Sequence, residues 1–219
     1  MKPLRIGIPI YKFVDLIDVA ATFDVLSRIP NYWTVRPLEL DIVGPTCDPI
    51  ATDQGVVLTP TKTFAQFDAA PLSVIIVPGS QHTDSATGDP QYMDFVTRQS
   101  INPDIEIVMS VCTGALILSA AGLLDGYMAT THWIGLDSLK KNANVRVVNG
   151  YPRWVRDRNR ITTAGVSSSI DGAFYLISQL CDDQTAKCAQ LITQYHPQPP
   201  FDTGDPAVAD PTTYFMVYG

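Results

Sequence analysis

Cys112 is the residue whose sequence context most clearly indicates a chemical role. A largely apolar run, residues 105–111, leads into it, and a run of helix formers, residues 115–121, follows it. The first run is rich in Ile and Val, as buried strands are, and the second is typical of a buried helix. Two positions away on either side stand the small residues Ser110 and Gly114. This spacing matches a nucleophile elbow, a sharp strand-to-helix turn that requires small neighbours and lifts the central side chain out of the sheet.

A thiol at such a turn lies at the N-terminus of the following helix. Free N–H groups and the helix dipole favour a thiolate there. We therefore expect Cys112 to be a nucleophile held as an anion. The competing interpretation is a small buried core cysteine, which is the usual state of a free thiol.

Composition limits what else the chain can do. Its 219 residues are 46% hydrophobic, enough for the core of one domain. A net charge of −7 argues against a nucleic-acid partner, which needs a basic face. The four cysteines form no C-x-x-C pair or zinc-type cluster, so we expect no metal. Without a signal peptide or an apolar run of about 20 residues, we expect a cytoplasmic protein that does not bind membranes.

Strand-like and helix-like segments alternate along the chain. We expect strands at residues 4–10, 38–44, 73–79, 105–111, 129–131, 145–148, 154–155 and 161–165, and a hairpin at 50–59 that turns at Gly55. We expect helices at 15–26, 92–99, 115–121, 136–141, 169–180 and 183–195, and a polar hairpin turn at 156–160. This order indicates an α/β fold with a parallel sheet and helices on both faces.

Ligands of such sheets bind beyond the carboxyl ends of the strands. Four segments follow expected strands: the loop before Asp18, residues 78–80, the Cys112 elbow and residues 163–165. We expect these four segments to meet at one edge of the sheet.

Three motifs carry a resemblance to a known family. They are Ser-Val-Cys-Thr-Gly at 110–114, Ala-Ala-Gly-Leu-Leu-Asp-Gly at 120–126 and Ala-Thr-Thr-His-Trp at 129–133. Together they resemble the DJ-1/PfpI superfamily, in the branch of the isonitrile hydratases and the amidotransferase-like domains of some AraC-type regulators. The resemblance runs from Ile6 to about Pro206. It implies one class I glutamine amidotransferase-like domain over residues 1–219, a flavodoxin-like three-layer α/β/α sandwich with a mostly parallel sheet, a Pro-rich tail at 197–219, and a homodimer.

Two further segments look most like the hydratases. They are Leu-Ile-Asp at 16–18 followed by Asp-Val-Leu at 24–26, and Tyr-His-Pro-Gln-Pro-Pro-Phe at 195–201. The regulators carry a helix-turn-helix domain after this one, for which the chain leaves no room before Gly219, and this favours the enzyme. The resemblance therefore implies a lyase that needs no cofactor and adds water to a small-molecule isonitrile to give an N-substituted formamide.

Three residues are the expected catalytic groups. Cys112 would attack the isonitrile carbon to form a thioimidate. By resemblance, Asp18 would serve first as general acid and then as general base. The competing interpretation of Asp18 is a solvated helix cap. Thr113 can place a hydroxyl and a backbone N–H beside the sulfur, or can simply begin the helix.

A second group of residues is expected to hold the substrate. Gly79 and Ser80 can offer backbone N–H groups to developing negative charge. Ile17 and Gly165 lie in the segments that follow other strands at the same edge of the sheet. The family form of the turn is Pro-Gly-Gly, whereas this chain has Ser80, where a positive φ is harder to adopt.

Other polar residues rank lower. Asp24 lies six residues after Asp18, and we expect it on an exposed polar face. We expect His132 to be packed or capping and His82 to be solvated in its loop. Because Thr113 rather than His follows the cysteine, peptidase, glyoxalase and amidase activities are disfavoured. The alternative from another class is a non-catalytic sensor or regulator with an oxidisable cysteine.

Overall fold

A seven-stranded sheet forms the centre of the molecule. The computed structural model describes residues 2–29 and 36–209. The strands run in the order β10-β11-β7-β6-β1-β2-β5, and every pair is parallel except β10 and β11. Their bounds are β1 (Leu4–Pro9), β2 (Leu38–Gly44), β5 (Lys62–Thr63), β6 (Val74–Val77), β7 (Ile107–Ser110), β10 (Trp154–Asp157) and β11 (Arg160–Thr163).

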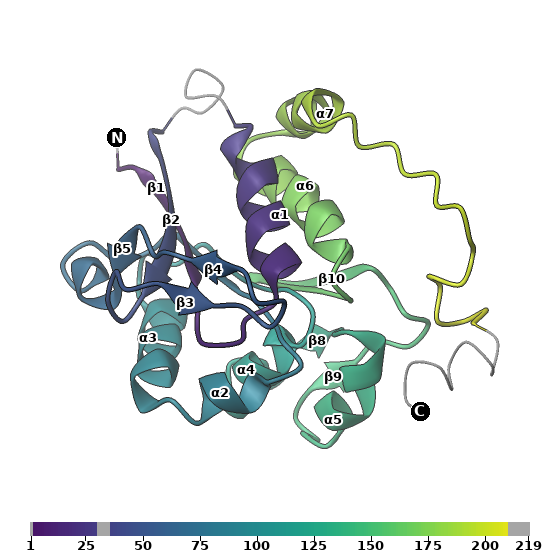
Figure 1. The fold of residues 1–219 in the computed structure, drawn as a ribbon, viewed down its shortest axis with the longest axis horizontal. Coiled ribbons are helices and arrows are strands. Elements are labelled where there is room, and N and C mark those ends of the chain that lie inside the picture. Colours follow the sequence, from purple (N-terminus) through teal and green to yellow (C-terminus); the bar gives the residue numbers. More distant parts are fainter. Residues whose placement is uncertain (1, 30–35, 210–219) are drawn as a thin grey trace.

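Helices cover both faces of this sheet. They are α1 (Leu16–Ser27), α2 (Thr83–Thr87), α3 (Pro90–Ile101), α4 (Gly114–Ala120), α5 (Leu136–Lys140), α6 (Ser168–Leu180) and α7 (Asp183–Ile192), with 3₁₀ turns η1 (Phe64–Phe67) and η2 (Trp133–Gly135). Helices α1 and α6 pack together on one face, and α2, α3 and α4 lie on the other (Figure 1). The expected flavodoxin-like three-layer α/β/α architecture is confirmed.

The two central strands explain the strongest sequence signal. Every residue of β6 and of β7 is buried, because helices cover both sides of these strands. A parallel strand covered in this way reads as a continuous apolar run rather than as an alternating one. The hydrophobic core therefore extends to the carboxyl ends of β6 and β7.

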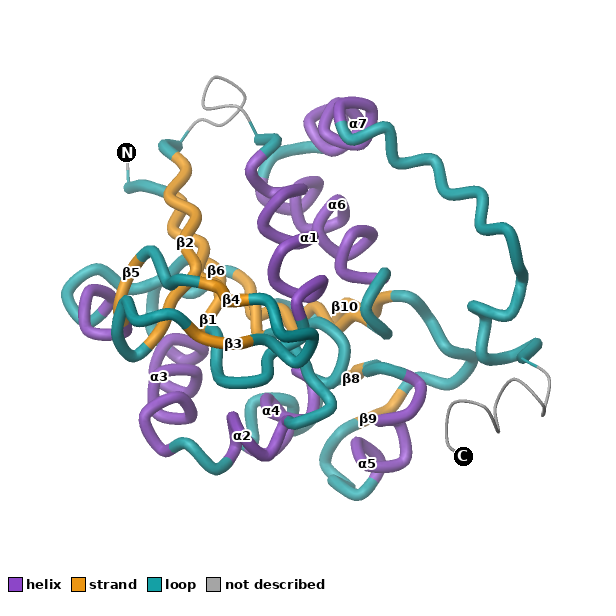
Figure 2. The backbone as a smooth tube through the Cα atoms, in the orientation of Figure 1, coloured by secondary structure: helices purple, strands orange, loops and turns teal. Residues whose placement is uncertain are grey.

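The small elements depart from expectation in places. The hairpin of β3 (Ile50–Ala51) and β4 (Val57–Leu58) forms as expected, with Gly55 at a φ of +82°. Strands β8 (Met128–Ala129) and β9 (Arg146–Val147) pair in a separate two-stranded sheet, which is visible beside α5 in Figure 2. The β10–β11 turn is shorter than the expected 156–160, because the ladder continues to Asp157 and Arg160. Helix α2 was not expected from the sequence.

Gly114 allows α4 to begin directly against β6. A Cβ atom at this position would lie 2.1 Å from the carbonyl oxygen of Val77, where the chain cannot yield without moving backbone. The elbow therefore requires glycine at position 114 because of a close approach between two backbone segments.

We predict that Gly114→Ala destabilises the protein by about 2–3 kcal/mol, the scale of an overpacked core site. The measurement is the free energy of unfolding by chemical denaturation. Gly204→Ala is the control, because a Cβ at that position meets nothing within 4 Å, and it should change the stability by less than about 0.5 kcal/mol. Equal stability of the two variants would contradict this account of the elbow.

Candidate active site

The backbone at Cys112 adopts the geometry that the elbow interpretation requires. Its φ is +54°, in the left-handed region that is strained for a residue with a side chain. Two hydrogen bonds hold it there: its N–H donates to the carbonyl oxygen of Ala164 at 3.1 Å, and its own carbonyl accepts from Thr131 Oγ1 at 2.8 Å. The strained backbone conformation of Cys112 is thus held by hydrogen bonds to the segment after β11 and to Thr131.

The sulfur of Cys112 is buried but lies among polar groups. The residue is 5% exposed, and the backbone N–H groups of Thr113 and Val166 favour a negative charge on the sulfur. Burial raises the pKa of the thiol, and the negative charge of Asp18 raises it further, whereas the two N–H groups lower it by less. The raised pKa opposes the expectation of a resting thiolate. Helix α4 has only seven residues, and desolvation outweighs the donors at its start.

Asp18 is a buried acid and not a solvated cap. The N-cap of α1 is Asp15, whose side chain accepts from the N–H groups of Ile17 and Asp18. The Asp18 side chain is fully buried, and its Oδ2 accepts from the Gly79 N–H at 2.8 Å. Among the described residues, its Oδ1 has no hydrogen-bond partner. Burial is the first cause that raises the pKa of Asp18 well above its ordinary value, and the charge of Asp15 adds to it.

The backbone N–H groups in the turn at residues 78–80 have hydrogen-bond partners that the sequence did not indicate. The Ser80 N–H donates to Thr113 Oγ1 at 2.8 Å, and that hydroxyl donates to the Ser80 carbonyl at 2.6 Å. Because the Gly79 N–H is bonded to Asp18, both expected oxyanion donors are engaged by the protein itself. The roles of these two N–H groups and of the Thr113 hydroxyl toward a substrate stay predictions, and in this structure all three groups have protein partners. The Thr113 backbone N–H lowers the pKa of the Cys112 thiol, and its role in catalysis stays a prediction.

The remaining predicted residues lie around this centre. Ile17 is 47% exposed in the first turn of α1, next to Asp18. Gly165 lies between Ala164 and Val166, both of which bind Cys112. Outside the centre, Asp24 pairs with Arg28 at 2.7 Å on an exposed face, as expected. His82 is exposed, with its Nε2 3.4 Å from Asp53 Oδ1 and its ring 5.2 Å from that of Phe13.

Sequence reasoning missed Val166, Thr131 and Asp15 as parts of the site. Val166 follows the end of β11, so the rule that ligands bind beyond strand ends could have indicated it. Asp15 is positioned by Gln54 from the β3–β4 hairpin, whose Nε2 donates to Asp15 Oδ2 at 2.9 Å. No sequence pattern indicates this long-range hydrogen bond.

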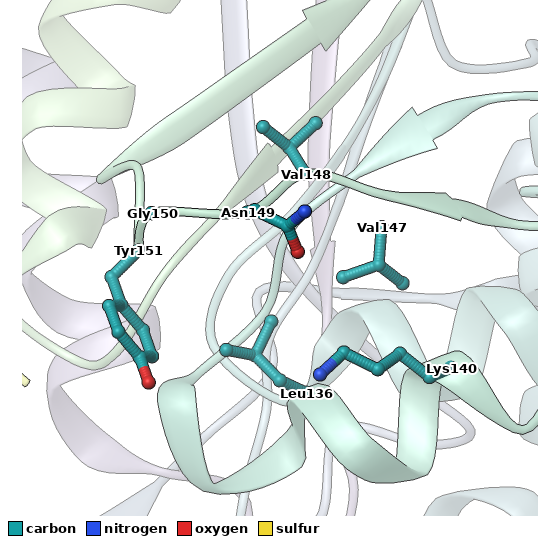
Figure 3. A pocket seen from close by; sticks show the side chains of 7 residues that line it. All are labelled: Leu136, Lys140, Val147, Val148, Asn149, Gly150 and Tyr151. Carbon is teal, nitrogen blue, oxygen red and sulfur yellow. The ribbon is translucent and has the colours of Figure 1, made fainter.

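A cavity of about 120 Å³ lies elsewhere on the molecule. Figure 3 shows its lining, which comes from α5 and the segment that leads out of β9: Leu136, Lys140, Val147, Val148, Asn149, Gly150 and Tyr151. Neither Cys112 nor Asp18 lines it. Within the described ranges, no group of three or more His, Cys, Asp or Glu side chains is arranged to hold a metal, and no helix is long and apolar enough to cross a bilayer.

Comparison with known proteins shows to which family this architecture belongs. The DJ-1/PfpI family model matches residues 4–179. The chain belongs to the DJ-1/PfpI family. It is 37% identical over 206 residues to an isonitrile hydratase of Pseudomonas putida, covering 94% of this chain and 85% of that protein. This identity supports a hydratase-like enzyme of the DJ-1/PfpI family.

Two other similar proteins differ in how much of the chain they match. A crystal structure of a ThiJ/PfpI family protein from Pseudomonas syringae superposes with a TM-score of 0.87 at 32% identity, covering all of this chain and 86% of that one. The transcriptional regulator GbdR of Pseudomonas aeruginosa is 39% identical over 70 residues, which are 32% of this chain and 19% of the regulator. The likeness to the hydratase therefore extends over far more of the chain than the likeness to the regulator.

We predict that Asp18→Asn stabilises the protein increasingly as the pH rises. The folded-state pKa of Asp18 lies above its unfolded value, so its contribution to stability is present at low pH and is lost as the pH rises from the ordinary carboxyl range to the raised pKa. Asparagine keeps an acceptor for the Gly79 N–H and cannot ionise.

The measurement is the Tm of both proteins from about pH 4 to 8. Asp24→Asn is the control, because it removes an exposed carboxylate and should shift the Tm little at any pH. A Tm difference for Asp18→Asn that is constant with pH, or that shrinks as the pH rises, would show that Asp18 has an ordinary pKa.

Proposed function

We propose that this protein hydrates an isonitrile to an N-substituted formamide, with Cys112 as nucleophile and Asp18 as the proton carrier. One observation carries the proposal. A buried carboxyl group has one oxygen fixed by the Gly79 N–H and the other without a hydrogen-bond partner among the described residues, and its charge raises the pKa of Cys112. An acid kept in this way can exchange a proton with a reacting molecule. The likeness to the P. putida isonitrile hydratase supports the substrate class.

The first half-reaction joins substrate and enzyme. Sulfur attacks the terminal carbon of R–N≡C, forming a C–S bond, and the same carbon must gain a proton. Asp18 delivers its own proton to that carbon and takes the thiol proton in exchange, which gives the thioimidate S–CH=N–R and leaves Asp18 protonated. The raised pKa values of Cys112 and Asp18 suit this step, because the pair keeps the proton that the carbon needs.

The second half-reaction releases the formamide. Asp18 donates its proton to nitrogen as the water oxygen adds to the thioimidate carbon, and it accepts a proton from that water. The C–S bond then breaks as the C=O bond forms, and the hydroxyl proton returns through Asp18 to the sulfur. The N–H groups of Thr113 and Val166 stabilise the negative charge on sulfur when it attacks and when it leaves.

The geometry favours this chemistry over a redox sensor. Oxidation of a cysteine follows its thiolate character and its exposure. Cys112 has a raised pKa and is 5% exposed, which opposes both requirements. The proposed reaction uses only protein groups, an isonitrile and water, with no cofactor. The cytoplasmic location, the homodimer, the absence of nucleic-acid and membrane partners, the single domain over 1–219 and the tail at 197–219 stay predictions.

We predict that the purified protein forms N-aryl formamide from a simple aryl isonitrile and that Cys112→Ala lowers kcat/KM by more than about 10³-fold, the scale of losing a nucleophile. Product formation is followed by chromatography. The matched control is Cys188→Ala on α7, which changes a free, half-buried thiol outside the site and should keep the activity. The proposal fails if the wild-type protein makes no formamide between pH 5 and 9.

A further inference from the structure

Arg153 contacts both ends of the turn that joins β11 to α6. This turn comprises residues 164–167, between the last residue of the strand and the first of the helix. The carbonyl oxygen of Arg153 accepts from the Ala164 N–H at 2.9 Å, and its Nη2 donates to Ser167 Oγ at 3.2 Å. One arginine thus holds the turn by its backbone at the first residue and by its side chain at the last.

The same turn borders the nucleophile. The Ala164 carbonyl accepts from the Cys112 N–H at 3.1 Å, and the Val166 N–H lowers the pKa of the Cys112 thiol by favouring negative charge on its sulfur. Both groups lie within the four residues that Arg153 contacts at either end. The position of the Val166 N–H therefore depends on how firmly this turn is held.

Asp171 fixes the guanidinium of Arg153. This carboxylate lies in the first turn of α6, and its Oδ2 accepts from Arg153 Nε at 2.7 Å and also from Nη2. The Arg153 side chain is 46% exposed and that of Asp171 is 19% exposed, so the ion pair adds little to global stability. The contact through two nitrogens instead sets the direction in which the guanidinium points, which a single ammonium group could not do.

Tyr195 completes this arrangement from the segment that follows α7. Its hydroxyl donates to Asp171 Oδ1 at 3.0 Å, and its ring packs on Phe174 with the ring centroids 5.5 Å apart. Burial raises the pKa of Tyr195, and the charge of Asp171 adds to it, so the hydroxyl keeps the proton that it donates. Tyr195 opens the segment 195–201, one of the two that look most like the hydratases. It is half-buried, whereas the residues after it in that segment are exposed. We call Arg153, Asp171 and Tyr195 the clamp.

We propose that Arg153 and Tyr195 are positioning residues for the proposed reaction, and that the clamp holds the Val166 N–H in place for the sulfur of Cys112. This inference rests on the proposed function. The sulfur carries negative charge when it attacks and again when it leaves, and an N–H group already held in place stabilises that charge without reorganisation. A loosened turn weakens this stabilisation in the transition state and leaves substrate binding unchanged, so kcat falls while KM does not change.

Arg153→Gln tests the clamp, and Arg156→Gln is its matched control. Both variants replace an exposed arginine that bonds to α6, but Arg156 donates to Gln179 in the last turn of that helix. In hydration of an aryl isonitrile we expect kcat to fall about 10-fold in Arg153→Gln, with KM changed by less than about 2-fold. This loss is smaller than the roughly 10²–10³-fold that follows complete removal of a preorganised donor. Arg156→Gln should keep the wild-type kcat, and the Tm of both variants should stay within about 4 °C of the wild-type value. An unchanged kcat in Arg153→Gln, or an equal loss in Arg156→Gln, would overturn the inference.

Two further variants separate positioning from charge. Arg153→Lys keeps the positive charge but loses the planar guanidinium, so we expect kcat to stay well below the wild-type value; full activity would show that charge alone matters and would overturn the inference. Tyr195→Phe keeps the ring on Phe174 and removes only the hydroxyl, which should lower kcat about 3-fold. Because Tyr195 acts through Arg153, the double variant should be no slower than Arg153→Gln alone. Losses that multiply in the double variant would show that the two residues act separately and would contradict the clamp.

Amide hydrogen exchange of the resting protein tests the clamp without turnover. The Val166 amide should exchange about 10-fold faster in Arg153→Gln and at the wild-type rate in Arg156→Gln, because local opening of the turn exposes it. An unchanged Val166 exchange rate in Arg153→Gln would overturn the inference even in an active enzyme, and would leave the hydratase proposal standing. A wild-type protein that forms no formamide would instead overturn the proposed function, and the exchange rate would still decide whether the clamp holds the turn.

Discussion

The site depends on burying two acidic groups, a thiol and a carboxyl, at one edge of a parallel sheet. Taking either anion out of water is unfavourable, so each group keeps its proton to a higher pH than it would in solvent. The backbone supplies a few N–H groups, and every one found at the site has a specific partner: Gly79 binds Asp18, while Thr113 and Val166 bind the sulfur. The protein thereby holds a proton close to a nucleophile instead of holding a naked thiolate.

This constraint explains why distant segments converge on the elbow. Asp15 caps α1 while Asp18 is buried, and Asp15 is in turn oriented by Gln54 from the β3–β4 hairpin. The carboxylate of Asp15 also adds negative charge near the site, which raises the pKa of Asp18. A helix cap, a surface hairpin and the proposed catalytic acid are thus parts of one electrostatic arrangement. The strain at Cys112 is held from the opposite side by Ala164 and Thr131.

The sequence was sufficient for the fold and for the strand-to-helix turn at Cys112, but not for the electrostatics of the candidate site. Periodicity indicated the main strands, because two-sided burial leaves continuous apolar runs such as β6 and β7. Small residues on both sides of Cys112 indicated the elbow. The pKa of the thiol was misjudged because a local motif shows the donors of α4 and not the depth of burial. The partners of Gly79 and Ser80 escaped prediction because their bonds join residues 61 and 33 positions apart.

Ser80 shows how a departure from the family pattern can be absorbed. The sequence raised the question of strain, because this turn usually has a second glycine. Ser80 is not among the described non-glycine residues with positive φ, whereas Phe13 is, at +68°. The Ser80 hydroxyl donates to the Phe13 carbonyl and accepts from the His82 N–H at 2.8 Å. The side chain therefore ties together the loops after β1 and β6. The strain lies in the first of these loops, while the turn that positions Asp18 and Thr113 keeps its hydrogen bonds.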